Sequence, residues 1–353
     1  ARARPRVVSD GVSRALGRDV NEEAARASYE EADVLFQSAA NAEDDEARKL
    51  YHQAALNYAH AALRFPDSML EENALFMAGE AHFFADEYKA AEKAYASLIE
   101  AYPNTQHIDR VDARRFDVAQ YWLAVHRDKP KFFLVPNWQD EKLPHNDTFG
   151  HAVRIFDKVR LDDPTGRLAD DATMAAASAH FANGDFDKAE MFLADLRRTY
   201  PESKHQFDAA LLAVKAKMKL YQGGDYDSQH LEEAIQLIEL AFAQFPQQAA
   251  EHREYLENAY KDIRVKLAMR DWETAQYYDN RAQYGGARHY YTKVLREFSD
   301  TSLAQDAEKR LIAIADRPDN PPQQAQWLVD MIPPQNNQHK PLISGNPFDF
   351  LRR

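Results

Sequence analysis

Six stretches of the chain end in the same way, with a helical pattern of apolar residues followed by a residue pair that stops it. Two of these stops are weak, at Asp163-Pro164 and Phe298-Ser299. The four strong stops are each an aromatic residue followed by proline: Phe65-Pro66, Tyr102-Pro103, Tyr200-Pro201 and Phe245-Pro246. Proline ends a helix because it has no N–H to donate and disfavours helical backbone in the residue before it. The stops therefore divide the chain into repeated helical units.

A fixed spacing precedes every stop. Counting back from the second residue of each stop, alanine stands twelve residues before it, a large apolar residue eight before it and an apolar residue five before it. The six alanines are Ala54, Ala91, Ala152, Ala189, Ala234 and Ala287. Spacings of four and three place the three positions on one face of a helix. We expect each alanine to lie where two helices cross closely, because alanine is small and has the highest helix propensity.

The repeated unit is a pair of helices. Residues 85–105 and 183–203 align with an offset of 98 and no gap, and each reads as a turn, a helix and a proline stop. An isolated helix pair cannot bury both of its apolar faces, so successive pairs stack. The order of Gly79, Ala91, Tyr95 and Pro103 matches the tetratricopeptide repeat, a helix-turn-helix unit. The sequence predicts an all-α, tetratricopeptide-like helical solenoid of about six helix pairs.

Three segments follow from this pattern. Residues 1–20 are an arginine-rich N-terminal segment, residues 21–315 are the solenoid, and residues 316–353 are a proline-rich C-terminal tail. Successive stops lie 37, 61, 37, 45 and 53 residues apart, so the third unit carries an insertion, at about residues 126–150.

The insertion contains an apolar stretch, "FFLVPNW", with Phe132, Phe133 and Trp138. Two interpretations stay open. The stretch either packs over the solenoid as a lid or binds a partner.

Composition and motifs argue against several functions. The formal net charge of −13 does not suit a general nucleic-acid binder. Without cysteine the chain has no disulfide or thiolate chemistry. No metalloprotease, nucleophile-elbow or phosphate-loop motif occurs. His82 and His180 recur at one repeat position and are interpreted as structural rather than metal-binding. We therefore predict no enzyme and no catalytic, cofactor-binding or metal-binding residue.

The C-terminal repeat carries a resemblance to a known family. Residues 273–314 contain Tyr277, Tyr278 and Arg281 near their start, in the spacing Y-Y-x-x-R. A helix, an aromatic-x-D-[ST] stop and a closing A-x-x-A-x-x-x-L helix follow. This order resembles the last repeat of the BamD (YfiO) family of outer-membrane assembly lipoproteins. Residues 65–105 are similar to the early repeats of that family, and the resemblance covers about residues 22–315.

The chain departs from the family in four ways. It has the insertion, and it has six repeat units where five are usual. Ala282 stands where a glycine commonly follows the motif arginine. The chain also lacks the cysteine that carries the lipid, so either that cysteine precedes residue 1 or this member is not lipidated.

The resemblance implies a non-catalytic scaffold at the periplasmic face of the outer membrane of a Gram-negative-type envelope. Its implied partners are a POTRA domain of a BamA-type insertase, unfolded β-barrel proteins and other subunits of the assembly machine. It places the insertase contact at Tyr277, Tyr278 and Arg281. The alternative for Arg281 is an intramolecular salt bridge to a neighbour such as Glu273 or Asp279.

The first helix of each repeat in such a solenoid lines a concave groove that accepts an extended peptide. We expect eight residues to face this groove, unless some of them belong to the core: Asn73, Phe76, Glu80, Phe83, Asp171, Met174, Ser178 and Phe181. Two other functions stay open. One is a tetratricopeptide adaptor for envelope division or secretion, of the YbgF (CpoB) kind, and the other is an enzyme or its regulatory subunit.

Overall fold

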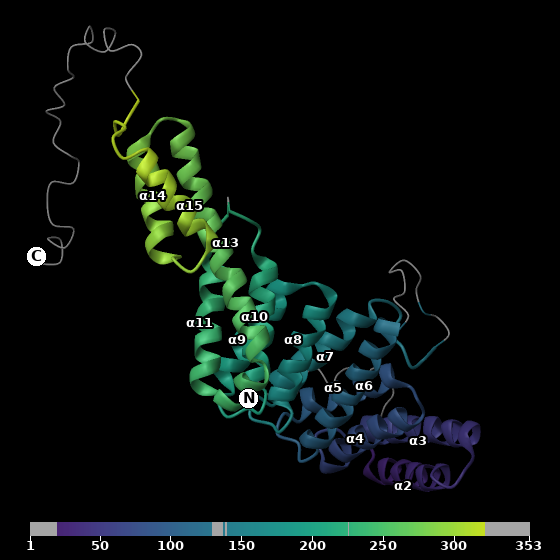
Figure 1. Ribbon diagram of the computed structural model, residues 1–353. Coiled ribbons are helices and arrows are strands. Elements are labelled where there is room, and N and C mark those ends of the chain that lie inside the picture. The colour runs from purple at the N-terminus through teal and green to yellow at the C-terminus, as the bar shows by residue number, and fades with distance from the viewer. Residues whose placement is uncertain (1–19, 129–136, 138–139, 225, 322–353) are drawn as a thin grey trace, which may run out of the picture. The chain divides into compact units, whose positions relative to one another are not determined.

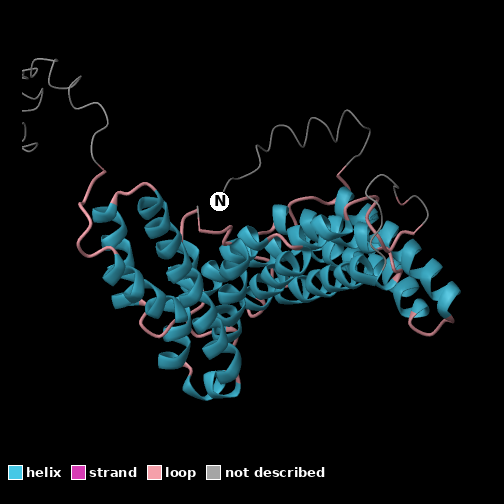
Figure 2. Cartoon of the chain, turned by 45° about the horizontal axis from the view of Figure 1, so that its top comes forward, coloured by secondary structure: helices cyan, strands magenta, loops and turns pink. Residues whose placement is uncertain are grey.

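The computed structural model describes residues 20–128, 137, 140–224 and 226–321 of the chain. Every regular element within these ranges is an α-helix (Figures 1 and 2). In chain order the helices are α2 (Glu22–Ala39), α3 (Asp44–Arg64), α4 (Met69–Phe84), α5 (Tyr88–Ala101), α6 (Ile108–Asp128), α7 (Thr148–Asp162), α8 (Ala169–Asn183), α9 (Phe186–Thr199), α10 (Gln206–Leu220), α11 (Gln229–Gln244), α12 (Pro246–Glu251), α13 (Arg253–Asn280), α14 (Tyr284–Glu297) and α15 (Ser302–Ala313).

The helices pack as pairs along the chain. Helix α2 packs on α3, α4 on α5, α6 on α7, α8 on α9 and α10 on α11. In the sixth pair, the C-terminal part of α13 shares a core with α14, which α15 completes. The predicted all-α, tetratricopeptide-like solenoid of about six helix pairs is confirmed.

The described residues form two compact units. Helices α2 to α12 and the start of α13 belong to the first unit, and α13 from Lys261 onward belongs to the second with α14 and α15. Each unit has its own apolar core. The boundaries predicted at residues 20/21 and 315/316 stay predictions.

The second helix of every pair ends where the stop pattern predicts. Helices α3, α5, α7, α9, α11 and α14 each finish at the residue just before the stop pair. All six alanines of the pattern are fully buried, and the residues at the other two positions are at most 2% exposed. The expected apolar face is therefore confirmed in all six helices.

Glycine and alanine allow the two helices of a pair to approach closely. A Cβ atom added at Gly79 on α4 would lie only 2.3 Å from Cε1 of Tyr95 on α5, so the ring occupies the space that a side chain would need. At an offset of 98 residues the same positions hold Ala177 and Leu193, both fully buried. Where alanine replaces the glycine and adds a methyl group, the facing residue is thus leucine, which is smaller than tyrosine.

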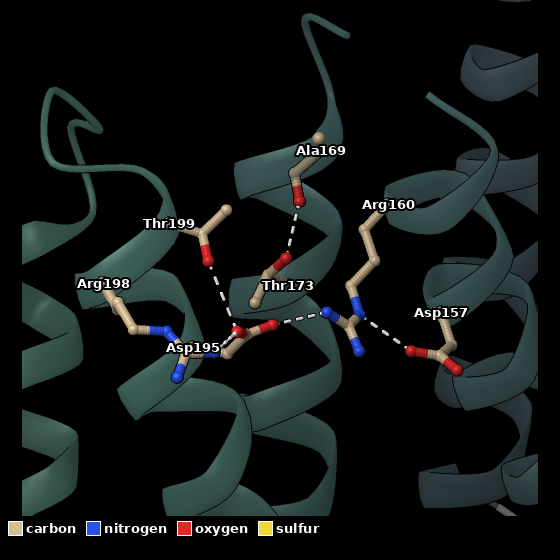
Figure 3. A network of polar contacts seen from close by, with 7 residues as sticks. All are labelled: Asp157, Arg160, Ala169, Thr173, Asp195, Arg198 and Thr199. Atoms are coloured by element: carbon tan, nitrogen blue, oxygen red, sulfur yellow. Dashed lines mark hydrogen bonds and ion pairs between the residues drawn. The ribbon is translucent and has the colours of Figure 1, made fainter. Parts of the chain in front are cut away.

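Neighbouring repeats are also joined by ion pairs. Arg160 on α7 donates to Asp157 at 2.7 Å and to Asp195 on α9 at 2.5 Å (Figure 3). Arg198 donates to the same Asp195 at 2.8 Å. The Arg160 guanidinium lies 5.0 Å from the ring centroid of Phe192, so the arginine contributes both a charge and a packing surface.

Four turns within the helix pairs share one backbone conformation. The residue seventeen positions before the stop has a positive φ at Asp86 (66°), Asp147 (47°), Gly184 (84°) and Ala282 (56°). Glycine adopts this left-handed region freely and aspartate tolerates it, whereas alanine is strained there. Ala282 occupies the position where the BamD family commonly has glycine.

The predicted insertion lies between α6 and α7. Its apolar residues Phe132, Phe133 and Trp138 lie outside the described residues. Closer to α7, the Lys142 carbonyl accepts a hydrogen bond from Nε1 of Trp122 at 2.7 Å, and the Lys142 amine pairs with Asp86 at 2.7 Å. Residues 140–147 therefore contact both α6 and the turn of the second pair.

Candidate functional site

The C-terminal end of α13 presents two side chains at the surface, Tyr277 in its last turn and Arg281 directly after the helix. Tyr277 is 54% exposed, and the Arg281 guanidinium lies 3.6 Å from the centroid of its ring. Such a cation–π contact holds both side chains in one arrangement. Among the described residues Arg281 makes no ion pair.

Asp279, one of the two internal partners considered for Arg281, pairs with another arginine. Its carboxylate accepts hydrogen bonds from Arg310 on α15 at 2.5 and 2.8 Å, and from the Tyr291 hydroxyl at 3.2 Å. The bond from Arg310 lowers the pKa of Asp279. The ion pair between Arg310 and Asp279 connects α13 to α15. Asp279 is therefore already paired, and Arg281 contacts the Tyr277 ring instead.

Tyr278 has a structural role in the same turn. Its ring stacks on Tyr290 at 5.7 Å with an interplanar angle of 10°. It also covers Gly286, where an added Cβ would lie 2.8 Å from Cγ of Tyr278. Of the three residues predicted at the insertase contact, Tyr277 and Arg281 are thus exposed, whereas Tyr278 packs within the unit.

Two of the four groove candidates on α4 are core residues. Phe76 and Glu80 are each 2% exposed. Phe76 stacks on His107 at 4.1 Å, and Glu80 accepts hydrogen bonds from the Tyr95 hydroxyl at 2.7 Å and from Arg114 Nε at 3.0 Å. A buried carboxylate needs such partners, so the structural interpretation applies to both residues.

The other two candidates on α4 are half-buried. Asn73 Oδ1 lies 2.9 Å from Nε2 of His107, in the turn after α5. The Phe83 ring lies below the Arg114 guanidinium, at 4.5 Å. Asn73 therefore ties the start of α4 to the following turn, and Phe83 supports an arginine.

The α8 candidates divide in a similar way. Asp171 contacts Nε2 of His205 at 2.6 Å and the Lys204 amine at 2.8 Å. Its contact with His205 is equivalent to that of Asn73 with His107, 98 residues earlier. Burial acts to raise the pKa of Asp171, but the bonds to His205 and Lys204 outweigh it and lower that pKa. Met174 packs against the core, and Phe181 contacts Phe186 edge-to-face at 5.2 Å. Ser178 alone among the four is exposed.

Ser178 lines a cavity of about 610 Å³ between α6, α7 and α8. Its other lining residues are largely small or apolar and include Leu123, Ala124, Phe149, Ala175 and Ala182. Sequence reasoning missed these residues because it considered the first helices of the second and fourth repeats and left out α6. The signal available was the run of small residues on α8, which leaves space beside the helix.

A polar cluster lies elsewhere in the first unit. Of the described residues, His52, His82 and Glu87 form the group whose ligand atoms lie close enough to hold a metal ion.

Two protein-family profiles match the chain. A profile of the YfiO family, described as "Outer membrane lipoprotein", matches residues 140–318, just over half of the 353 residues. The chain belongs to the YfiO family of outer membrane lipoproteins. The matched region includes α13, α14 and α15, and therefore Tyr277 and Arg281. A second profile, for the tetratricopeptide repeat, matches residues 73–105, which contain most of α4 and all of α5.

YfiO and tetratricopeptide proteins are in general non-catalytic scaffolds or adaptors that act through protein–protein contacts, in the case of YfiO in outer-membrane assembly. The family description fits a protein of the cell envelope. Within the described ranges, every helix is too short or too polar to span a membrane.

Other comparisons add little. No curated protein matches the chain. Among solved structures, the C-terminal part of a tetratricopeptide repeat-containing protein from Cytophaga hutchinsonii aligns over 79% of this chain and 98% of its own, with 13% identity and a TM-score of 0.27. A score that low carries no argument about the fold.

Proposed function

We propose that the protein is a non-catalytic periplasmic scaffold of a β-barrel assembly machinery. It binds a POTRA domain of a BamA-type insertase and receives unfolded β-barrel proteins, held at the outer membrane by a lipid anchor or by its partner. The observation that carries this proposal is the YfiO match over residues 140–318, within which Tyr277 and Arg281 form an exposed pair.

The chemistry of this pair suits an insertase contact. Arginine can bind a carboxylate at two points while its stem packs on an aromatic ring. Tyrosine and arginine are also enriched among the residues that dominate binding energy at interfaces. Because the cation–π contact already orders Arg281, less side-chain entropy is lost when a partner binds.

The cavity beside Ser178 supports a role in substrate reception. An unfolded β-barrel strand alternates apolar and polar side chains. A largely apolar cavity of about 610 Å³ can accept one or two of its apolar side chains. The exposed Ser178 hydroxyl at its edge offers a hydrogen bond to the extended backbone.

The insertase contact is tested by charge reversal. Arg281→Glu should weaken binding to the insertase by tenfold or more, measured by retention of the insertase on the purified protein. The matched control is Arg296→Glu, which makes the same charge change at an exposed position of α14. Normal helicity with lost retention supports the proposal. Equal retention by both variants would remove Arg281 from the interface.

Substrate reception is tested by photo-crosslinking. A photo-reactive residue at Ser178 should form adducts with unfolded β-barrel precursors, whereas one at Leu240, an exposed position outside the cavity, should not. Equal adducts at both positions would indicate nonspecific contact. Recovery of division or secretion proteins in place of the insertase and its precursors would favour the adaptor function instead.

A further inference from the structure

Three potential metal ligands from three separate segments meet in the first unit. His52 lies on α3, His82 on α4, and Glu87 immediately precedes α5. Nδ1 of His52 lies 2.7 Å from one carboxylate oxygen of Glu87, and Nδ1 of His82 lies 2.6 Å from the other. All three ligand atoms lie within 4.8 Å of one another.

The repeat 98 residues later shows what this position looks like without the third ligand. His180 and Asp185 occupy the places of His82 and Glu87, and they form a hydrogen-bonded pair at 3.3 Å. The residue equivalent to His52 is Gly150, which has no side chain to offer. A histidine and a carboxylate are therefore enough to build this turn, and the structural role of the pair does not account for His52.

The cluster opens into a cavity of about 360 Å³. The cavity is also lined by Asp140 and His145 of the insertion, and by Lys89 of α5. His82 and Glu87 are largely buried, with side chains 15% and 14% exposed, whereas His52 is 47% exposed. A cation can therefore reach a partly buried carboxylate from solvent without any opening of the core.

We propose that His52, His82 and Glu87 form a binding site for a divalent transition metal ion of the Zn²⁺ type. Two imidazole nitrogens and a carboxylate, with a fourth position left to water or to a residue of the insertion, are a ligand set that zinc takes in proteins. At zinc–ligand distances of about 2.0–2.1 Å, ligand atoms in a tetrahedral site lie about 3.3 Å apart. The nitrogen–oxygen separations of 2.7 and 2.6 Å therefore need to widen by about 0.6–0.7 Å, which side-chain rotations provide.

Electrostatics favours a cation here. Burial acts to raise the pKa of Glu87, but the hydrogen bond from His82 and the two histidine charges outweigh it and lower that pKa. Glu87 is therefore ionised at neutral pH and can act as a ligand. An imidazole nitrogen binds a metal only without a proton, so metal binding should weaken at acid pH.

The site would connect the first helix pair to the second. His52 belongs to α3, while His82 and Glu87 flank the turn between α4 and α5. An ion that binds the folded chain and not the unfolded chain stabilises the fold, and the stabilisation grows with the logarithm of the ion concentration above the dissociation constant. Metal availability in the envelope would thus set the stability of the N-terminal repeats.

The test uses the full chain without a histidine tag, stripped with a chelator. Equilibrium dialysis against ZnCl₂ should show one site, and Co²⁺ should give the absorption of a tetrahedral complex. His52→Ala changes a half-exposed side chain and should fold normally, but should lower zinc affinity at least tenfold and remove the cobalt spectrum. Glu87→Gln keeps a hydrogen-bond acceptor and should have the same effect.

The matched control is His60→Ala, which removes an exposed histidine from the same helix. Its affinity for zinc should equal that of the unaltered protein. His145→Ala shows whether the insertion supplies a fourth ligand, in which case affinity also falls. The proposal is overturned if the unaltered protein binds no zinc, or if His52→Ala binds it as tightly as His60→Ala does.

Discussion

Ala282 is strained by the turn in which it lies. Its φ of 56° falls in the left-handed region, where the Cβ atom crowds the following carbonyl group. The turn itself is well bonded, since the Ala282 N–H donates to Asp279 O at 2.9 Å and the Gln283 N–H to Tyr278 O at 3.0 Å. The backbone of the repeat thus imposes a conformation that this side chain disfavours.

Ala282→Gly should therefore stabilise the protein, by about 0.5–1 kcal/mol in the free energy of unfolding. Urea titration followed by helicity would measure the change. Ala27→Gly, at an exposed position inside α2, is the matched control and should destabilise by about 1 kcal/mol. If both substitutions destabilise the protein, the backbone at Ala282 is not strained.

Asp112 on α6 predicts a pH dependence of stability. It is 4% exposed, and its Oδ1 has no hydrogen-bond partner among the described residues. Burial raises the pKa of Asp112 to about 7, with Arg115 opposing the shift and the Asp162 and Asp163 carboxylates adding to it. In the unfolded chain this group titrates near 3.8. Because the folded state holds the proton more tightly, stability falls as the pH rises from about 4 to 7.

Asp112→Asn removes this titration. Between pH 5 and pH 8 the free energy of unfolding should fall less in the variant than in the unaltered protein. At pH 8 the variant should be more stable by at least about 1 kcal/mol, since each pKa unit corresponds to about 1.4 kcal/mol. Thermal unfolding at the two pH values would measure both effects, and parallel losses in the two proteins would contradict the raised pKa.

Individual functional residues were harder to predict than the core. Apolar residues at helical spacing located the buried faces of the helices. Phe76 and Glu80, however, were assigned to a groove, although each is 2% exposed. Neither the His107 ring that covers Phe76 nor the Arg114 that pairs with Glu80 lies near it in the sequence. His52 gave no signal because Glu87, which it contacts, lies 35 residues away in the sequence. Contacts between repeats decide these roles.

The helix pairs themselves follow from local sequence. A stop pair and an alanine at a fixed distance before it are signals within one helix, so all six second helices were located. The short α12 was not anticipated, because no stop pattern marks it. The repeats differ in the residues through which their two helices contact each other, as the contact between Gly79 and Tyr95 shows.

Gly79→Ala should destabilise the second pair by about 1–3 kcal/mol, since the new methyl group overlaps the Tyr95 ring. Tyr95→Leu should reduce that cost, because Ala177 and Leu193 already pack in this combination. Glu80 keeps its bond to Arg114 in either variant. The double variant should therefore be more stable than the sum of the single changes predicts, by about 1 kcal/mol in a double-mutant cycle from denaturant unfolding. Simple additivity would show that the overlap is relieved elsewhere.

A repeat array is coupled mainly between neighbours, so damage should stay local. The second unit has its own core, in which Tyr291 packs with Ala275, Val294 and Ala307. Tyr291→Ala should create a cavity that costs about 3–5 kcal/mol. Hydrogen exchange should then lose protection in α14 and α15, while protection in α2 to α5 stays unchanged. Loss of protection throughout would mean that the chain unfolds as one cooperative body.

The segment between α6 and α7 bears on how such a chain can change over generations. The two helices pack directly on each other, so the pair closes whatever length of chain connects them. The entropy of closing a loop rises only with the logarithm of its length, by about 0.6 kcal/mol for each doubling. A gene can therefore gain or lose residues here in a single event without disturbing the stacking of the other repeats. Length at this junction is nearly neutral, so a solenoid of this kind can acquire a new surface here.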